Sequence, residues 1–384
     1  MPDFNMIKIR RAINLVICFV FVIVLSLPFV LQITGIQFDN STSENSKKMK
    51  FPVLNLTTNK MFLTDFSLFT NQFNTYYTDN FVVRKMMIQL YIYVKVNLFY
   101  TSPIPEKIVI GKEDWLFLGD GYSKAITETK GITNFSEEEL NKITNNIIEF
   151  EKYFKQKQIK FFLAIAPEKS TVYGDNLPIK QSSKQTKLEQ LRKRLSAIGF
   201  NLIDLKADLK KDQSYPLYYK TDSHWNQIGM YYGYLRLMKS ICPSFPMVKI
   251  LQFDNFSIDS SNRNYTGDMA WQLSLKTKEP RFNLTSLIKK ERVKLPNKYK
   301  RPSSYVYNPE SYERRYENMN GKLKVLIFHD SFFQEMQKFI AESFQNTVFI
   351  WSTMDKGIIE KEKPDIVIRE MVEREIDQLK YPLK

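Results

Sequence analysis

The sequence has 384 residues, of which 43% are hydrophobic and 25% are charged. This composition supplies a sizeable core and excludes a disordered chain, and two cysteines are too few for a disulfide-stapled one. The formal charge of +15 suits nucleic acid, anionic lipid or acidic polysaccharide, and equally a Lys-rich solvated surface. We expect no nucleic-acid partner, because there is no Arg run and no Cys–His finger spacing. Only two histidines are present, His224 and His329, so multi-histidine metal sites are nearly excluded.

An apolar run follows the N-terminus. No charged residue lies between Ala12 and Phe38, and about 20 residues of helix suffice to span a bilayer. Lys8, Arg10 and Arg11 precede the run closely, which favours a cytoplasmic N-terminus and an exported body. The run is longer than a signal-peptide core and no Ala-x-Ala site follows it, so we predict an uncleaved signal anchor rather than a cleaved peptide or a buried helix.

We divide the chain into five segments. They are a cytoplasmic N-terminus (1–11), a signal-anchor transmembrane helix (12–36), a polar linker (37–50), a helical lead-in (51–105) and a catalytic domain (106–384).

The catalytic segment reads as alternating strands and helices. The pattern predicts a hairpin over 108–121, a helix from 134 with a Ser136–Glu139 capping box, a helix over 187–198, and strands over 161–166, 201–205, 323–328, 348–351 and 366–368. Strands that are unbroken apolar runs indicate a parallel sheet buried on both faces. The predicted class is therefore α/β, with the site at the carboxyl ends of the strands. No phosphate-loop or dinucleotide fingerprint occurs, and we predict neither a cofactor nor a metal.

Two segments carry candidate chemistry. Asp222 and His224 lie at the start of a predicted helix that has Trp225 on its apolar face. Ser331 follows the strand over 323–328 at the start of another helix. A serine at a strand-to-helix turn lies beside unpaired N–H groups and at the positive end of a helix dipole. His224 could serve as its base and Asp222 could orient the imidazole.

Simpler interpretations stay open for these residues. Ser331 and Asp222 are also typical helix N-caps. His329 competes as the base, although residues so close on one strand rarely align for proton transfer, so we favour His224.

The order of motifs resembles the alginate O-acetyltransferase family, in its J and X types, whose domain is SGNH-hydrolase-like. The resemblance rests on DSHW (222–225) followed by DSF (330–332), and on weaker segments at 79–84, 111–117, 167–173, 267–269 and 364–374. It implies a permuted SGNH-like parallel sheet flanked by helices. It also implies Ser331 as nucleophile, His224 as base and Asp222 as orienting group.

The same resemblance implies a function and a location. The protein would be an O-acetyltransferase that forms an acyl-serine and acetylates an exported polysaccharide, with a multi-pass membrane acyltransferase as acetyl donor. It would be held in the inner membrane by a single span, with its catalytic domain in the periplasm. An acidic glycan is one candidate polymer. Asp114 and His329 depart from the family pattern, and we expect no carbohydrate-binding domain after the catalytic one, as in the J type.

Two other functions remain open. The same triad suits a carbohydrate acetylesterase, because the two reactions differ only in the acyl acceptor. A non-catalytic polysaccharide-binding assembly protein is the alternative from another class.

Four further residues are candidates for oxyanion or substrate contacts: Lys169, Asp268, His329 and Trp225. The simpler interpretations are a solvated turn lysine, a tight-turn aspartate, a strand-end histidine and a helix-packing tryptophan.

Overall fold

The computed structural model describes residues 4–34, 49–53, 62–81, 83–182, 184–209 and 214–383. Most of the predicted linker, 37–50, lies outside these residues. The chain forms two compact units, Met1–Pro103 and Ile104–Lys384.

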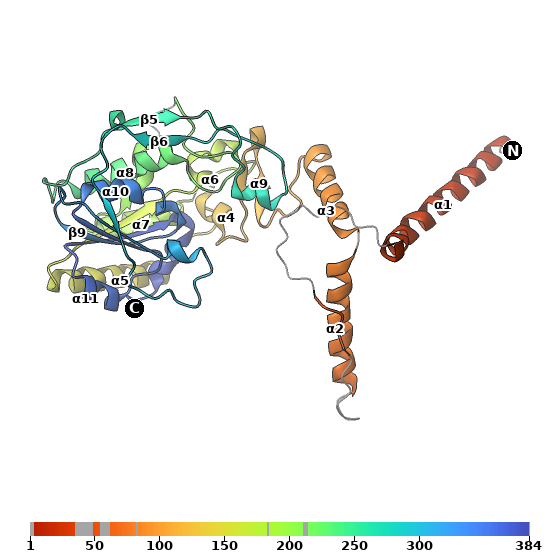
Figure 1. The fold of residues 1–384 in the computed structure, drawn as a ribbon, viewed down its shortest axis with the longest axis horizontal. Coiled ribbons are helices and arrows are strands. Elements are labelled where there is room, and N and C mark those ends of the chain that lie inside the picture. Colours follow the sequence, from red (N-terminus) through yellow and green to blue (C-terminus); the bar gives the residue numbers. More distant parts are fainter. Residues whose placement is uncertain are drawn as a thin grey trace. The chain divides into compact units, whose positions relative to one another are not determined.

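The first unit is helical. Its helices are α1 (Phe4–Thr34), α2 (Phe62–Asn80) and α3 (Arg84–Tyr93), and α3 continues into a π-helical turn, Val94–Leu98 (Figure 1). Within α1, the stretch Ile9–Pro28 is long and apolar enough to cross a membrane, and none of it is buried. This helix is compatible with the predicted single-pass anchor.

The second unit contains a seven-stranded sheet in the order β4-β3-β11-β9-β10-β8-β7. The strands of this sheet are β3 (Lys160–Ala166), β4 (Ile203–Asp204), β7 (Val293–Leu295), β8 (Glu313–Glu317), β9 (Lys324–Phe328), β10 (Asn346–Ile350) and β11 (Ile366–Val372). Two antiparallel pairs lie outside it: β1 (Ile108–Ile110) with β2 (Leu116–Leu118), and β5 (Phe256–Asp259) with β6 (Asn283–Ser286).

The prediction of an α/β fold is confirmed, but the sheet is mixed rather than wholly parallel. The five strands from β4 to β10 are parallel, whereas β8 pairs antiparallel with β10 and β7 antiparallel with β8. The sequence of β8, ERRYE, contains no apolar run. Its buried residues include the charged pair Glu313 and Arg315, which form an ion-pair network with Glu362. Apolar patterning therefore missed this strand.

Helices cover both faces of the sheet. The helices of this unit are α4 (Ala125–Thr129), α5 (Glu137–Gln156), α6 (Lys169–Val172), α7 (Lys187–Ala197), α8 (Gln227–Ile241), α9 (Asp268–Gln272), α10 (Gln337–Ser343) and α11 (Lys356–Glu362). Residues of β3 alternate between two hydrophobic clusters, one containing α8 and α10 and the other α5, α7 and α11 (Figure 1). This alternation explains why β3 is apolar at nearly every position.

Local signals explain where several elements begin and turn. The Ser136–Glu139 capping box predicted for α5 is present. The predicted hairpin forms from β1 and β2, and Asp114 in its turn has a φ of 62°. That left-handed conformation favours glycine, and aspartate tolerates it better than most residues, which accounts for the departure from the family pattern at this position.

Candidate active site

The nucleophile candidate, Ser331, lies just beyond β9 in a tight turn. The sequence predicted an α-helix beginning here, but the turn is a 3-10 helix, Ser331–Phe333, and α10 starts only at Gln337. Asp330 caps this turn: its Oδ1 accepts from the N–H of Phe332 at 2.8 Å. Its Oδ2 accepts from the N–H of Val372 at 2.7 Å, which ties the turn to the end of β11. The serine is held by neighbouring strand ends rather than by a long helix.

The second half of the site is the loop before α8. Asn226 is the N-cap of α8, accepting from the N–H groups of Ile228 and Gly229. Trp225 lies before the helix in an isolated bridge with Tyr218, not on the helix face predicted for it. It is fully buried, and its indole N–H donates to the carbonyl of Phe332 at 2.9 Å. This bond joins the His224 loop directly to the Ser331 turn.

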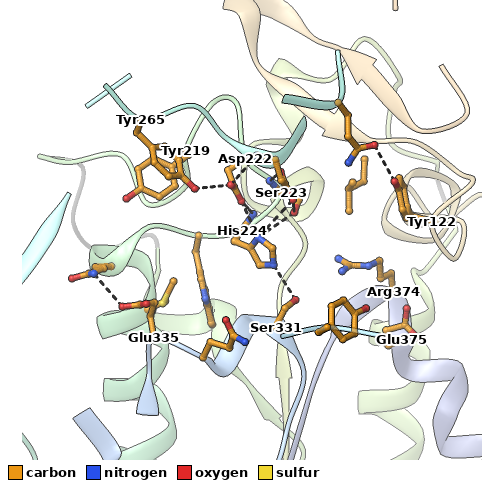
Figure 2. Close-up of a pocket in the computed structure, with 18 of the residues that line it drawn as sticks. Tyr122, Tyr219, Asp222, Ser223, His224, Tyr265, Ser331, Glu335, Arg374 and Glu375 are labelled. Carbon is orange, nitrogen blue, oxygen red and sulfur yellow. Dashed lines mark hydrogen bonds and ion pairs between the residues drawn. The ribbon is translucent and has the colours of Figure 1, made fainter. Parts of the chain in front are cut away.

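The three residues of the predicted triad form a chain of two hydrogen-bonding contacts with His224 in the middle. The Oγ of Ser331 is 2.9 Å from Nε2 of His224, and Nδ1 of His224 is 2.8 Å from Oδ1 of Asp222. Figure 2 shows His224 between the other two side chains. Ser331 and Asp222 are therefore not the helix caps of these segments: Asp330 and Asn226 are.

Asp222 is fixed by further donors. Its Oδ2 accepts from the Tyr265 hydroxyl at 2.6 Å and from the N–H of Asp268 at 3.0 Å. Burial raises the pKa of Asp222, but the bonds and charge of His224 outweigh it and hold the pKa well below its usual range. The carboxylate is thus ionised and its lone pairs are directed.

His224 is shifted the opposite way. Burial lowers its pKa, but the hydrogen bond and negative charge of Asp222, with the charge of Asp268, bring about a net increase above the ordinary value. A second carboxylate therefore supports the imidazolium: Oδ2 of Asp268 is 3.8 Å from Nδ1 of His224. Asp268 also accepts from the N–H of Ser223 at 2.7 Å and from the Ser223 hydroxyl.

Lys169 stabilises the loop that contains Asp222 and His224 through hydrogen bonds to its backbone. Its Nζ donates to the carbonyls of Tyr219, Lys220 and Asp222 at 3.0, 3.1 and 2.6 Å. The side chain is fully buried, and burial lowers its pKa to about 7. Lys169 is therefore neither the solvated turn lysine nor an oxyanion donor in the cavity, because its donors are directed at backbone carbonyls.

Glu279 and Gly267 hold the other side of the loop. Glu279 accepts from the N–H groups of Lys220 and Thr221 at 2.8 and 2.9 Å. A Cβ on Gly267 would lie 2.3 Å from the carbonyl carbon of Thr221, so only glycine allows this approach. No sequence pattern marks Glu279 or Tyr265 as site residues, since both lie in irregular segments of the chain.

His329 is buried away from the serine. Its Nδ1 donates to the carbonyl of Asp330 at 2.7 Å, and its Nε2 accepts from the side-chain amide of Gln337 at 3.0 Å. Burial lowers the pKa of His329 to about 3, so the ring is neutral. With both ring nitrogens engaged, His329 is not placed to act as the base or to contact substrate.

The triad opens into a cavity of about 580 Å³. Its lining includes Arg374 and Glu375, which follow β11, and Trp351, which follows β10. These positions agree with the rule that open α/β sheets bind ligands at the carboxyl ends of their strands. Arg374 and Trp351 were not predicted as site residues, because Trp351 was predicted to lie within the strand over 348–351 and Arg374 lies well beyond the predicted strand over 366–368.

One group of possible metal ligands occurs among the described residues, Asp222, His224 and Asp268. All three already bond to one another or to Ser223, Tyr265 and Ser331, so the group is accounted for by the hydrogen-bond network.

Residues 108–303 match the protein family described as SGNH hydrolase-like domain, acetyltransferase AlgX, over just more than half of the chain. The chain belongs to this family. Bacillus cereus PatB1 with a sulfonyl adduct has a similar fold, at 17% identity and a TM-score of 0.53, covering 72% of this chain and 97% of that one. No curated protein matches the sequence.

Two Pseudomonas structures also align with the chain. The O-acetyltransferase domain of Pseudomonas putida AlgJ is 15% identical with a TM-score of 0.46, covering 72% of this chain and 94% of its own. Pseudomonas aeruginosa AlgX is 15% identical with a TM-score of 0.42, covering 71% of this chain and 62% of its own.

The site predicts a defined pH dependence. Because the pKa of His224 lies above its ordinary value of 6.5, the neutral base is lost as the pH falls through a pKa higher than 6.5. We expect kcat/KM for a chromogenic acetyl ester to decline on the acid side accordingly. In Asp222→Asn the raising interaction is gone, so the acid limb should move to lower pH while kcat falls by roughly 10³- to 10⁴-fold. An acid limb at the same pH in both proteins would contradict the assignment.

Proposed function

We propose that the protein is an O-acetyltransferase that carries the acetyl group on Ser331 and passes it to a hydroxyl of an exported polysaccharide. The observation that carries the proposal is the Ser331–His224–Asp222 hydrogen-bond chain in a domain of the AlgX acetyltransferase family. The donor would be a multi-pass membrane acyltransferase, and the apolar helix Ile9–Pro28 would keep the domain near it outside the membrane.

In the first half-reaction Ser331 attacks the acetyl carbonyl of the donor. As the Oγ–C bond forms, Nε2 of His224 takes the hydroxyl proton, and Asp222 stabilises the resulting imidazolium. The tetrahedral intermediate then collapses, the bond to the donor's leaving group breaks, and His224 returns its proton to that group. Acetyl-Ser331 remains.

In the second half-reaction a sugar hydroxyl takes the place of the leaving group. His224 accepts its proton while the hydroxyl oxygen attacks the acetyl-serine carbonyl. Collapse breaks the bond to Oγ, His224 reprotonates Ser331, and the acetylated sugar leaves.

Arg374 is suited to stabilise the oxyanion formed in both steps. Arg374 and Ser331 line the same cavity, as Figure 2 shows, and the Arg374 guanidinium lies 5.6 Å from the ring of Phe332, the residue after the serine. The side chain is 14% exposed and paired with buried Glu168, so it is fixed before substrate binds. A fixed cation in a partly dry site stabilises developing negative charge more strongly than water does.

Replacement of the nucleophile tests the proposal in cells. In Ser331→Ala we expect polysaccharide to be exported normally but to carry no acetyl ester, because no acyl-enzyme can form. Acetyl content is measured on purified polymer by proton NMR. Ser352→Ala, which changes a serine outside the cavity, serves as the matched control and should leave the acetyl content unchanged. Wild-type acetylation in Ser331→Ala would overturn the mechanism and favour the non-catalytic assembly role.

An acetylesterase is the second candidate, because the His224 side chain is 30% exposed and water can reach it. The two functions separate in a competition assay with purified protein, a chromogenic acetyl ester and a glycan acceptor. We expect acetyl transfer to the glycan to exceed release to water, and the transfer to depend on acceptor concentration. Acetate release that is insensitive to glycan would identify an esterase.

The role of Arg374 is testable with the same ester. In Arg374→Gln we expect kcat to fall by about 10²- to 10³-fold with little change in KM, since the cation acts on the transition state. Arg374→Lys keeps the charge and should recover part of the rate. Arg194→Gln, which breaks a surface pair with Glu137, is the control and should keep the wild-type kcat. Equal losses in the Lys and Gln variants, with thermal unfolding lowered in both, would indicate a merely structural role.

A further inference from the structure

An aromatic pair lines the catalytic cavity and takes no part in the mechanism above. Trp351 and Tyr307 stack with ring centroids 4.5 Å apart and ring planes 17° from parallel. Both line the cavity that contains Ser331, and Tyr307 is 55% exposed. A large aromatic surface left open at a catalytic cavity is a typical feature of a ligand-binding site.

The sheet fixes the pair close to the serine. Trp351 follows β10 and Ser331 follows β9, and these two strands are parallel neighbours with Ile350 in register with Phe328. Adjacent strands lie about 4.8 Å apart, so side chains at their carboxyl ends share one site. The backbone N–H of Trp351 also donates to the carbonyl of Tyr312 at 2.9 Å, and this bond fixes the backbone of Trp351.

Other rings keep the pair rigid. Tyr305 meets Tyr307 and Trp351 edge-on, at 5.5 and 5.8 Å between centroids. His329 lies 6.1 Å from Trp351, and this neutral, buried imidazole supports the indole. The aromatic surface is therefore organised before a ligand arrives, which reduces the entropic cost of binding.

The charges around the cavity define what this surface can accept. The described residues of the lining include four carboxylates and two guanidinium groups: Asp222, Asp268, Glu335 and Glu375 against Arg281 and Arg374. Arg374 is paired with Glu168, and Glu335 lies 3.7 Å from the Nζ of Lys338. An acidic sugar would meet repulsion from Asp268 and Glu375, and like charges brought together disfavour binding.

We infer that Trp351 and Tyr307 form an acceptor subsite that stacks the pyranose ring of an uncharged sugar, so that the cavity selects a neutral glycan segment over a uronate one. Stacking places the C–H face of a pyranose against the electron-rich face of the aromatic rings, and the carboxylates then hydrogen-bond to its hydroxyls. The inference rests on the proposed function, since it assigns the acceptor of that reaction. In this inference the charge of the cavity lining, and not the formal charge of +15 of the whole chain, determines which sugar binds.

Direct binding to the Ser331→Ala protein tests the subsite without acetyl transfer. The probes are neutral hexasaccharides of glucose, mannose, galactose and N-acetylglucosamine, and a hexauronate, titrated by calorimetry at 0.15 M salt. We expect at least one neutral probe to bind more tightly than the hexauronate. Adding Trp351→Ala should raise its Kd about tenfold or more, which corresponds to 1.4 kcal/mol. Trp351→Phe should retain most of the affinity.

Two further variants keep the test decisive. Tyr307→Ala alters an exposed ring, so the fold is retained, and it should also weaken binding of the neutral probe. Trp271→Ala removes a tryptophan that is 55% exposed and does not line the cavity, and it should bind as the parent does.

Each remaining outcome counts against the subsite. Equal affinity in the Trp351→Ala and Trp271→Ala proteins, tighter binding of the hexauronate, or no binding of any neutral probe would overturn it. Neutral-sugar binding that needs Trp351, in a protein whose Ser331 form acetylates nothing, would instead reject the proposed transferase and keep the binding site.

Discussion

One hydrogen bond organises the active site: the 2.9 Å contact between His224 and Ser331, which lie 107 residues apart in the sequence. Neither residue can hold the other alone, so the geometry depends on how the two loops are fixed. The Ser331 turn is tied to β11 through Asp330, and the His224 loop is tied to the turn through the indole of Trp225. Lys169 stabilises the His224 loop by donating hydrogen bonds to three of its backbone carbonyls. The catalytic contact is therefore a product of buried polar bonds.

The electrostatics of the site and of the whole protein differ in sign. The chain carries a formal charge of +15, yet the cavity lining holds more carboxylates than cations. The excess of lysine is therefore a property of the surface, where it aids solubility or long-range association. Inside the cavity, Asp222 and Asp268 raise the pKa of His224, and this role accounts for two of the carboxylates in the lining.

The sequence was most informative where chemistry or apolar runs left few alternatives. Only two histidines are available as the base, so few assignments were possible. The strands β3, β9, β10 and β11 could be predicted from their apolar runs because both faces of each are buried. Sequence patterns fail where charged residues are buried. The buried Arg315 conceals β8 from apolar patterning, and the pattern at Lys169 indicates a solvated turn although the side chain is buried. Tyr265 and Glu279 were beyond prediction, since irregular segments have no periodicity that reports which distant loop they contact.

The aromatic pair bears on the balance between transfer and hydrolysis. In the proposed mechanism, water and a sugar hydroxyl would attack acetyl-Ser331 by the same chemistry, and the exposed side of His224 would admit both. Only positioning can favour the sugar, and a well-oriented reactant can reach effective molarities of about 10⁵ M or more. Trp351 lies at the end of the strand next to the one that carries Ser331, so a ring stacked there would present a hydroxyl beside the acyl group. In this fold, then, the residue that follows β10 would decide whether a serine-histidine-aspartate site acts as a transferase or as an esterase.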